Sequence, residues 1–233
     1  MTRPGLHPRT SAPAFLDRSD AGRRLAECLS EYLPDLKDTA TLVLGLARGG
    51  VPVGWEVAAT LRAPLDVFMV RKLGVPRWPE LAMGALAGGG HVVVNNDVVA
   101  DLRISDEELR SAIECEQAEL HRREVAYRGG RPAAELHGRV VIIVDDGIAT
   151  GASMLVAVRA VQATEPAATV VAVPVGPQSA CRKLAQEADD VVCATTPTAF
   201  DTVGRHYRDF HQISDDEVRN LLATPPPPGL PLD

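Results

Sequence analysis

Two adjacent carboxylates, Asp145 and Asp146, follow a short apolar run and are the residues of this chain best suited to chemistry. The run, 140–144, contains only valine and isoleucine, a pattern typical of a strand buried on both faces. Small and hydroxyl-bearing residues follow the acids, and a helical pattern begins near residue 154. Free amides at a helix start bind phosphate, and paired acids bind sugar hydroxyls or hydrated magnesium. The arrangement therefore suits a phosphorylated sugar.

The turn between the acids and the helix supplies the groups for phosphate binding. Thr150 and Ser153 carry hydroxyl donors, and Gly151 lets the backbone approach a ligand closely. The alternative is an ordinary strand-to-helix turn, with Asp146 as a turn residue and Ser153 as a helix cap. That alternative explains single residues, but it does not explain the double acid together with Thr-Gly.

This segment resembles the phosphoribosyl-pyrophosphate (PRPP) motif of the type I phosphoribosyltransferases. That motif is an apolar strand, two acids, a few variable positions, Thr-Gly, a small residue and then Thr or Ser. The resemblance covers about 41–194 and is strongest at 140–153. It implies magnesium-dependent transfer of ribose 5-phosphate from PRPP to a nitrogenous base or another nitrogen acceptor, with release of pyrophosphate. The alternative is a non-catalytic regulatory module that senses PRPP or a nucleotide.

The resemblance also implies roles for the residues of the motif. Asp145 and Asp146 would hold the ribose hydroxyls, stabilise positive charge on the sugar, and bind Mg²⁺ directly or through water. The 5-phosphate would lie on the turn formed by Ala149, Thr150, Gly151, Ala152 and Ser153. Oxopurine enzymes of the family carry an acid where this chain has Ala149, so the acceptor base stays open.

Two further strand ends carry residues that the resemblance assigns to pyrophosphate. Arg48, Gly49 and Gly50 resemble the family's pyrophosphate loop, which sometimes contains a non-proline cis peptide bond; the alternative is a plain glycine turn with Arg48 in solvent. Arg71 and Lys72 follow the strand expected at 65–70 and are the further catalytic candidates. For these two residues, the alternative is a strand end with solvated charges.

The C-terminal part, 197–212, holds three of the seven Phe and Tyr residues of the chain. In the family a small hood, often near the C-terminus, supplies the base pocket. Phe200 and Tyr207 are therefore candidates for base binding, and the alternative is that they anchor this segment to the core. His206 and His211 lack a helical metal-binding spacing and are expected to be structural or surface residues.

The composition of the 233 residues is that of a globular protein with a net charge of −7. An acidic balance argues against a nucleic-acid or membrane surface. Residues 1–14 lack the apolar core of a signal peptide, and the four cysteines are widely spaced, so we expect a cytoplasmic protein with reduced thiols. A homodimer is implied by the resemblance alone.

Alternating strand and helix patterns predict an α/β fold with a doubly wound, mainly parallel sheet. We expect a flexible loop or a short hairpin at 73–90, where glycine and proline are frequent. Capping boxes at Ser105–Glu108 and Ser214–Glu217 predict helix starts. The expected organisation is given by residue range: an extended arm at 1–14, a single domain at 15–222 with a helical insertion at about 95–130 and a hood at about 195–222, and a proline-rich tail at 223–233.

Overall fold

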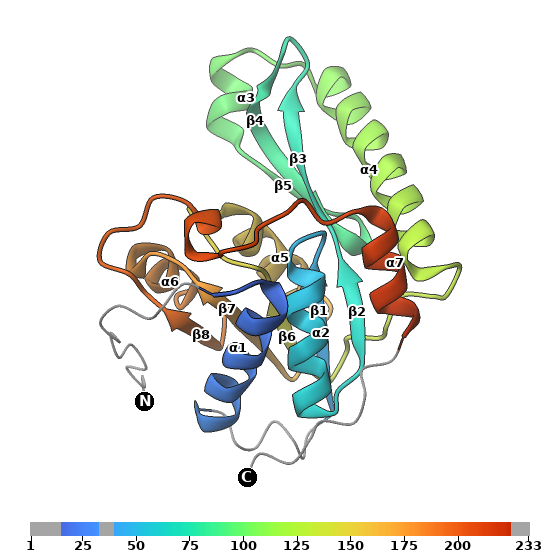
Figure 1. Ribbon diagram of the computed structural model, residues 1–233. Helices are drawn as coiled ribbons and strands as arrows, with labels where there is room; N and C mark the ends of the chain where they lie inside the picture. Colours follow the sequence, from blue (N-terminus) through green and yellow to red (C-terminus); the bar gives the residue numbers. More distant parts are fainter. Residues whose placement is uncertain (1–14, 33–39, 225–233) are drawn as a thin grey trace.

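The computed structural model describes residues 15–32 and 40–224 (Figure 1). The expected N-terminal arm at 1–14 and nearly all of the expected proline-rich tail lie outside the described residues. Of the helices in the described ranges, none combines the length and the apolar composition needed to cross a membrane.

Five parallel strands form the main sheet, as the alternating pattern predicted. Their spatial order is β2-β1-β6-β7-β8. The strands are β1 (Thr41–Leu46), β2 (Leu65–Phe68), β6 (Val140–Val144), β7 (Ala168–Val175) and β8 (Asp190–Thr195). The chain steps from β1 outward to β2 and later returns to the other side of β1 with β6. The order of the strands therefore reverses between β1 and β6, where ligands of such sheets usually bind.

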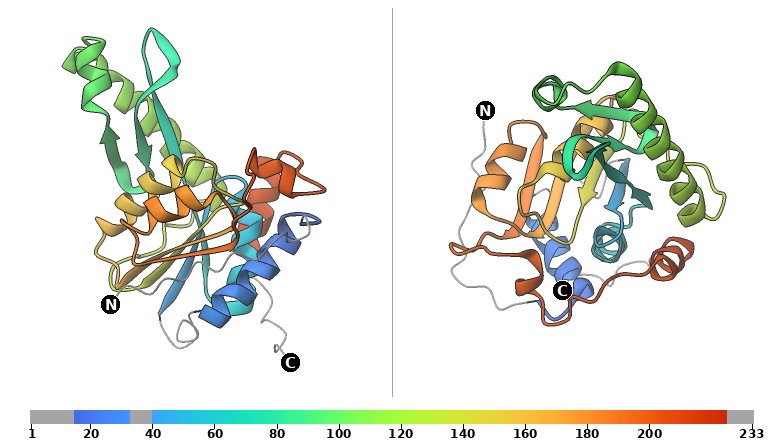
Figure 2. Two further views of the ribbon diagram at one scale, coloured as in Figure 1. Left: turned by 90° about the vertical axis from the view of Figure 1, so that its left-hand side faces the viewer. Right: turned by 90° about the horizontal axis from the view of Figure 1, so that it is seen from above.

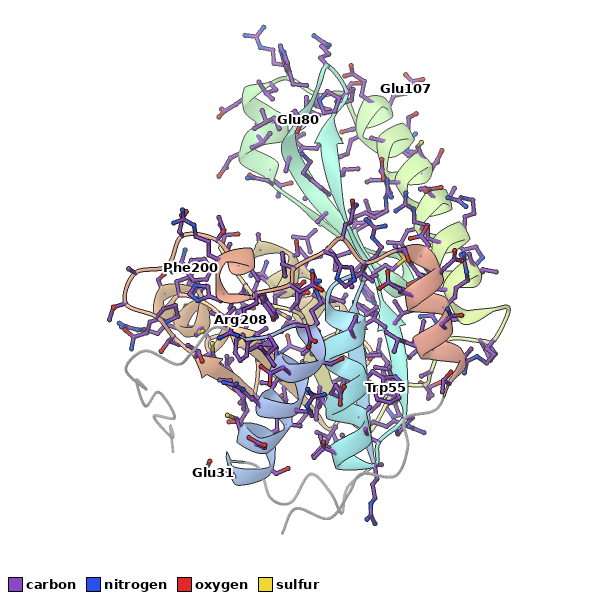
Figure 3. All side chains as sticks on the ribbon, viewed as in Figure 1. Glu31, Trp55, Glu80, Glu107, Phe200 and Arg208 are labelled. Atoms are coloured by element: carbon purple, nitrogen blue, oxygen red, sulfur yellow. The ribbon has the colours of Figure 1, made fainter. Side chains whose placement is uncertain are left out.

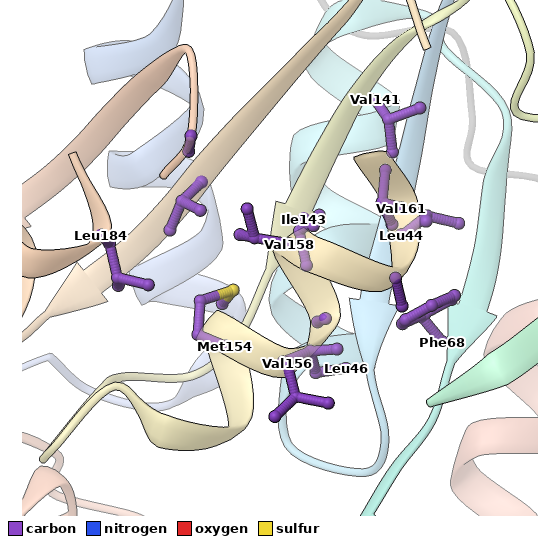
Figure 4. Close-up of a cluster of buried hydrophobic side chains, with 14 of the residues drawn as sticks. Leu44, Leu46, Phe68, Val141, Ile143, Met154, Val156, Val158, Val161 and Leu184 are labelled. Atoms are coloured by element: carbon purple, nitrogen blue, oxygen red, sulfur yellow. The ribbon is translucent and has the colours of Figure 1, made fainter. Parts of the chain in front are cut away.

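Helices cover both faces of this sheet (Figures 1 and 2). One face packs against α1 (Arg18–Tyr32) and α2 (Gly50–Leu61), and the other against α5 (Ala152–Gln162) and α6 (Gln178–Leu184). Alternate residues of β6 divide between these faces: Ile142 and Val144 lie in the cluster with α1 and α2, and Ile143 lies in the cluster with α5 (Figure 4). Because β1, β6 and β7 are buried almost throughout, their apolar runs were sufficient to predict them.

A second, antiparallel sheet rises from the carboxyl edge of the main sheet (Figure 1). It consists of β3 (Val70–Val75), β4 (Trp78–Ala87) and β5 (His91–Val94), with the short η2 (Gly88–Gly90) between the last two. The short helix α3 (Asn96–Asp101) and the long helix α4 (Asp106–Arg128) follow. The predicted capping box is present at the start of α4, because Ser105 and Glu108 exchange side-chain and backbone hydrogen bonds.

The C-terminal segment crosses the carboxyl end of the main sheet and then reaches α4 and α2, against which its last helix packs (Figures 1 and 2). It contains η3 (Val203–His206) and ends in α7 (Asp215–Ala223), which begins at the predicted capping box of Ser214 and Glu217. Tyr207 forms an isolated parallel bridge with Phe15, which closely precedes α1. The start of the described chain and its C-terminal segment therefore lie side by side.

The structure corrects the prediction for 65–90. The expected strand at 65–70 ends at Phe68, and Arg71 and Lys72 lie inside β3 instead of beyond a strand end. The segment that follows forms the β3–β4 hairpin, so the hairpin alternative is the one observed. The hydrogen-bond partner changes within two residues: the Phe68 carbonyl accepts from Ala47, which directly follows β1, whereas the Met69 carbonyl accepts from Gly88 of η2.

A buried ion pair ties α4 to the main sheet. The Arg128 Nε donates to both carboxylate oxygens of Asp66 at 2.9 and 3.1 Å, and its Nη2 donates to the Val67 carbonyl. Asp66 also accepts the backbone amide of Ala134 at 2.9 Å. The Arg128 and Asp66 side chains are only 9% and 12% exposed, so loss of one partner would leave the other charge buried.

We predict that Arg128→Leu lowers the free energy of unfolding by about 3–5 kcal/mol, because it leaves Asp66 buried without its counter-ion. Urea denaturation of wild type and variant measures this difference. The control is Arg159→Leu, which breaks the more exposed Arg159–Glu187 pair and should cost about 1 kcal/mol or less. Equal losses in the two variants would contradict the assigned role of the Asp66–Arg128 pair.

Candidate active site

The acid pair lies at the carboxyl end of β6, beside β1, where the strand order reverses. Asp145 follows Val144 directly, and its Oδ1 accepts the backbone amide of Asp146 at 2.9 Å. Burial raises the pKa of Asp145 well above its usual value, and the negative charge of Asp146 raises it further. Burial also raises the pKa of Asp146, although the Arg18 guanidinium partly opposes that shift. Two adjacent acids held in this way are acceptors for donor groups of a ligand.

The glycine turn after β1 lies directly against Asp146. A Cβ atom on Gly49 would lie 2.0 Å from Asp146 Oδ2, and one on Gly50 would lie 2.3 Å from the Val144 carbonyl oxygen. Neither position has room for a side chain, which gives the double glycine a packing reason. The peptide bond between Ala47 and Arg48 is cis. The turn after β1 and the acids after β6 therefore form one continuous surface.

The predicted phosphate-binding turn leads from the acids to the start of α5. Gly151 caps this helix with φ 78° and ψ 4°, a left-handed conformation that favours glycine. Ala149, Thr150, Ala152 and Ser153 are exposed, and the first turn of the helix contains no acidic residue. The turn is anchored from below, because the buried Ile148 donates its amide to the Val175 carbonyl at 2.9 Å. An exposed helix start with hydroxyls beside it can bind a phosphate.

The basic residues predicted for pyrophosphate are engaged in ion pairs. Arg71 pairs with Glu116 of α4, and the Lys72 amine lies 3.8 Å from a carboxylate oxygen of Glu80. Arg48 lies at the same edge of the sheet as the acid pair. Its Nη1 is 3.5 Å from Oδ1 of Asp215, at the start of α7. The Arg48 and Lys72 side chains are still 35% and 48% exposed to solvent, and the contact of all three basic residues with pyrophosphate stays a prediction.

The two predicted base-binding aromatics differ in their surroundings. Tyr207 is only 6% exposed, and its ring packs against those of Phe15 and Phe210 with centroid distances of 5.4 and 4.9 Å. Its hydroxyl donates to the backbone carbonyl of Asp146 at 2.5 Å. Because Tyr207 is buried in this conformation, its ring is not accessible to a base, and its hydroxyl supports the acid pair instead. Phe200, which Figure 3 labels in the C-terminal segment, is half-buried. Its ring stacks on that of His206, and its role stays a prediction.

Arg18 is a site residue that the sequence analysis missed. Its Nε donates to Asp146 Oδ2 at 2.8 Å, although the two residues are 128 positions apart. In the sequence, Arg18 is one of several charged residues at the start of an amphipathic helix, with no local motif to distinguish it. The contact of Arg18 with Asp146 can be recognised only from the tertiary structure.

The carboxylates offer a partial set of ligands for magnesium. Within 15–32 and 40–224, no group of three or more His, Cys, Asp or Glu side chains is arranged to hold a metal ion. Mg²⁺ commonly uses one or two carboxylates and completes its shell with waters and substrate phosphates. Asp145 and Asp146 fit that mode of binding, since both lie beside a turn suited to phosphate.

We predict that Gly49→Ala lowers the free energy of unfolding by about 1–3 kcal/mol, because the added methyl group must displace the Asp146 carboxylate or the turn. Chemical denaturation measures the change. In the control Gly54→Ala, on α2, the nearest atom to the new Cβ is a leucine methyl at 3.3 Å, and the change should cost little or stabilise the helix. A neutral Gly49→Ala variant would contradict the contact described here.

Comparisons with known proteins agree with the fold and with the motif. Residues 13–208 match the model of the phosphoribosyl transferase domain. Two curated proteins of Mycobacterium tuberculosis, "Putative phosphoribosyl transferase MT0597" (strain CDC 1551 / Oshkosh) and "Putative phosphoribosyl transferase Rv0571c" (strain ATCC 25618 / H37Rv), are each 50% identical to the chain over 209 residues. That alignment covers 89% of this chain and 46% of each relative, so the chain spans about half the length of the curated relatives it matches.

A solved structure is similar over almost its whole length. The crystal structure of TT1426 from Thermus thermophilus is 41% identical in sequence, with a TM-score of 0.75, and the match covers 90% of this chain and 97% of that one. Together with the family match over 13–208, these relatives show that the chain belongs to the phosphoribosyl transferase domain family.

Proposed function

We propose that this protein transfers ribose 5-phosphate from PRPP to a nitrogen acceptor and releases pyrophosphate. The observation that supports this best is that the acid pair contacts the glycine turn at the edge of the sheet where the chain also leads into the start of α5. PRPP carries a phosphate, a ribose with two free hydroxyls and a pyrophosphate, and each part has a matching group here. The family match supports ribosyl transfer from PRPP in general.

The 5-phosphate would bind at the turn of Ala149, Thr150, Gly151, Ala152 and Ser153. The backbone amides at the exposed start of α5 would donate to the phosphate oxygens, and the positive end of the helix dipole would attract the phosphate. The hydroxyls of Thr150 and Ser153 add donors. The left-handed Gly151 lets the backbone come within hydrogen-bond distance of phosphate oxygens.

The ribose would bind to Asp145 and Asp146. One oxygen of each carboxylate has a partner in the protein, because Asp145 Oδ1 accepts the Asp146 amide and Asp146 Oδ2 accepts from Arg18. The second oxygen of each can accept a ribose hydroxyl. When the bond to pyrophosphate breaks, positive charge develops on the sugar ring, and fixed negative groups stabilise it.

The pyrophosphate would lie over the Arg48-Gly49-Gly50 turn, whose backbone can approach closely because Gly49 and Gly50 have no side chains. Arg48, Arg71 and Lys72 would exchange their present ion pairs for contacts with the leaving group. A bound magnesium ion, held by Asp145 and Asp146 directly or through water, would neutralise charge on the pyrophosphate.

The acceptor is a small molecule with a nucleophilic nitrogen. Ala149 offers no carboxylate to handle a purine ring nitrogen, and Phe200 is the predicted aromatic residue that remains for stacking on a base. The homodimer and the cytoplasmic location stay predictions, and a role in nucleotide metabolism is part of this proposal.

We predict that Asp145→Asn and Asp146→Asn each lower turnover by about a hundredfold or more, because loss of one such charged contact costs roughly 3 kcal/mol in the transition state. Pyrophosphate release from PRPP and magnesium, with a panel of purine and pyrimidine bases, measures this loss. The matched control is Asp101→Asn, the same chemical change at an exposed residue of α3, which should keep wild-type activity.

The outcomes separate enzyme from sensor. Base-dependent release that both site variants lack would identify the acceptor. PRPP binding without release from any base would favour the alternative, a regulatory module that senses PRPP or a nucleotide. Near-normal activity of both site variants would overturn the assigned roles of the acids.

A further inference from the structure

Arg18 occupies an unusual position for a charged residue. It begins α1, yet its side chain is only 8% exposed and reaches across to the acid pair after β6. The Nε to Asp146 Oδ2 distance is 2.8 Å, and the Asp146 side chain is 14% exposed. A buried arginine is costly unless its donors are satisfied, so its partners indicate its purpose.

The contacts of the guanidinium lead to Asp146 and to the C-terminal segment. The Nη1 donates to the His211 carbonyl at 2.8 Å. The guanidinium carbon lies 4.0 Å from the centroid of the Phe210 ring and 6.0 Å from that of Tyr207. Cation–π contact with a ring face at this distance holds a guanidinium plane in place. Arg18 therefore links one carboxylate of the site to residues 207–211.

The same segment holds the backbone of Asp146. Tyr207 donates its hydroxyl to the Asp146 carbonyl, and Phe15 and Tyr207 form the bridge that joins the start of the described chain to its C-terminal segment. The Phe15 amide donates to the His206 carbonyl at 2.7 Å, and the Arg208 amide donates to the Phe15 carbonyl at 2.8 Å. Asp146 is thus held through its side chain by Arg18 and through its main chain by Tyr207.

The orientation of the carboxylate follows from these contacts. Oδ2 lies between Arg18 and the Gly49 backbone, where a Cβ would be only 2.0 Å away. Oδ1 is the oxygen left for a ligand. The positive charge of Arg18 also offsets one of two adjacent negative charges, and without it an anionic ligand would meet both carboxylates uncompensated.

We propose that Arg18 is a positioning residue for PRPP binding, and that it acts through Asp146 without touching the substrate. The proposal rests on the proposed function, because it assigns Asp146 to the ribose. Arg18 fixes which oxygen of Asp146 faces the ribose hydroxyls and compensates the negative charge of the pair. It also ties that carboxylate to the C-terminal segment, so the acid and residues 207–211 keep one arrangement.

The test is a double-mutant cycle with Arg18→Met, Asp146→Asn and the double variant, read out as PRPP affinity by calorimetry in the presence of magnesium. We expect Arg18→Met to weaken binding by about tenfold, and to add little once Asp146 is already Asn, since contacting residues are strongly non-additive. Arg18→Lys keeps the charge and should recover part of the loss. Melting temperatures of all variants show whether each is folded.

Each result decides a different question. Wild-type protein that does not bind PRPP overturns the proposed function, and with it this inference. Wild-type binding with unchanged affinity in Arg18→Met, or with fully additive losses in the double variant, overturns the inference and leaves the proposed function standing. If Arg18→Met does not fold, the same cycle with Arg18→Lys gives the coupling, and additivity there overturns the role of Arg18.

Discussion

The turn after β1 and the turn after β6 touch, and the site depends on that contact. The two strands are neighbours in parallel register, with Gly45 opposite Val144, so they reach the carboxyl edge at the same level. Gly49 then lies against Asp146 with no room for a side chain. This close approach brings a backbone without side chains and a pair of acids to the same place. Helix α5 begins near the same edge. The acid pair, the glycine turn and the helix start, which suit the parts of PRPP, therefore lie where the strand order reverses.

Electrostatics imposes the next constraint. Two adjacent acids at a largely buried strand end favour protonation, as the raised pKa of both Asp145 and Asp146 shows. The fold counters this with a local amide for Asp145 and a distant guanidinium for Asp146. Because that guanidinium is itself desolvated, it needs the His211 carbonyl and the Phe210 ring. A charged pair at the site thus requires α1 and the C-terminal segment to lie together.

Two ion pairs hold the long helix α4 against the main sheet and against the second sheet. Arg128 at the end of α4 binds Asp66 of β2, and Arg71 of β3 binds Glu116 farther up the same helix. The helical insertion therefore has specific contacts with both sheets. Its charges gave no sign of these contacts in the sequence, because most of them are exposed and only a few turn inward.

The sequence by itself determined the central strands of the main sheet, the two capped helices and the PRPP motif, because each depends on residues a few positions apart. Valine-rich runs predict buried strands, and Ser105 and Ser214 form their capping boxes within three residues. The tertiary structure alone decided the break at Met69, where the apolar run continues but the hydrogen-bond partner changes from the turn after β1 to η2. It alone decided that Tyr207 supports Asp146 instead of stacking on a base, and that Arg18 reaches Asp146 across 128 positions. Such contacts carry no local pattern, since they arise only when distant segments are packed around the same carboxylate.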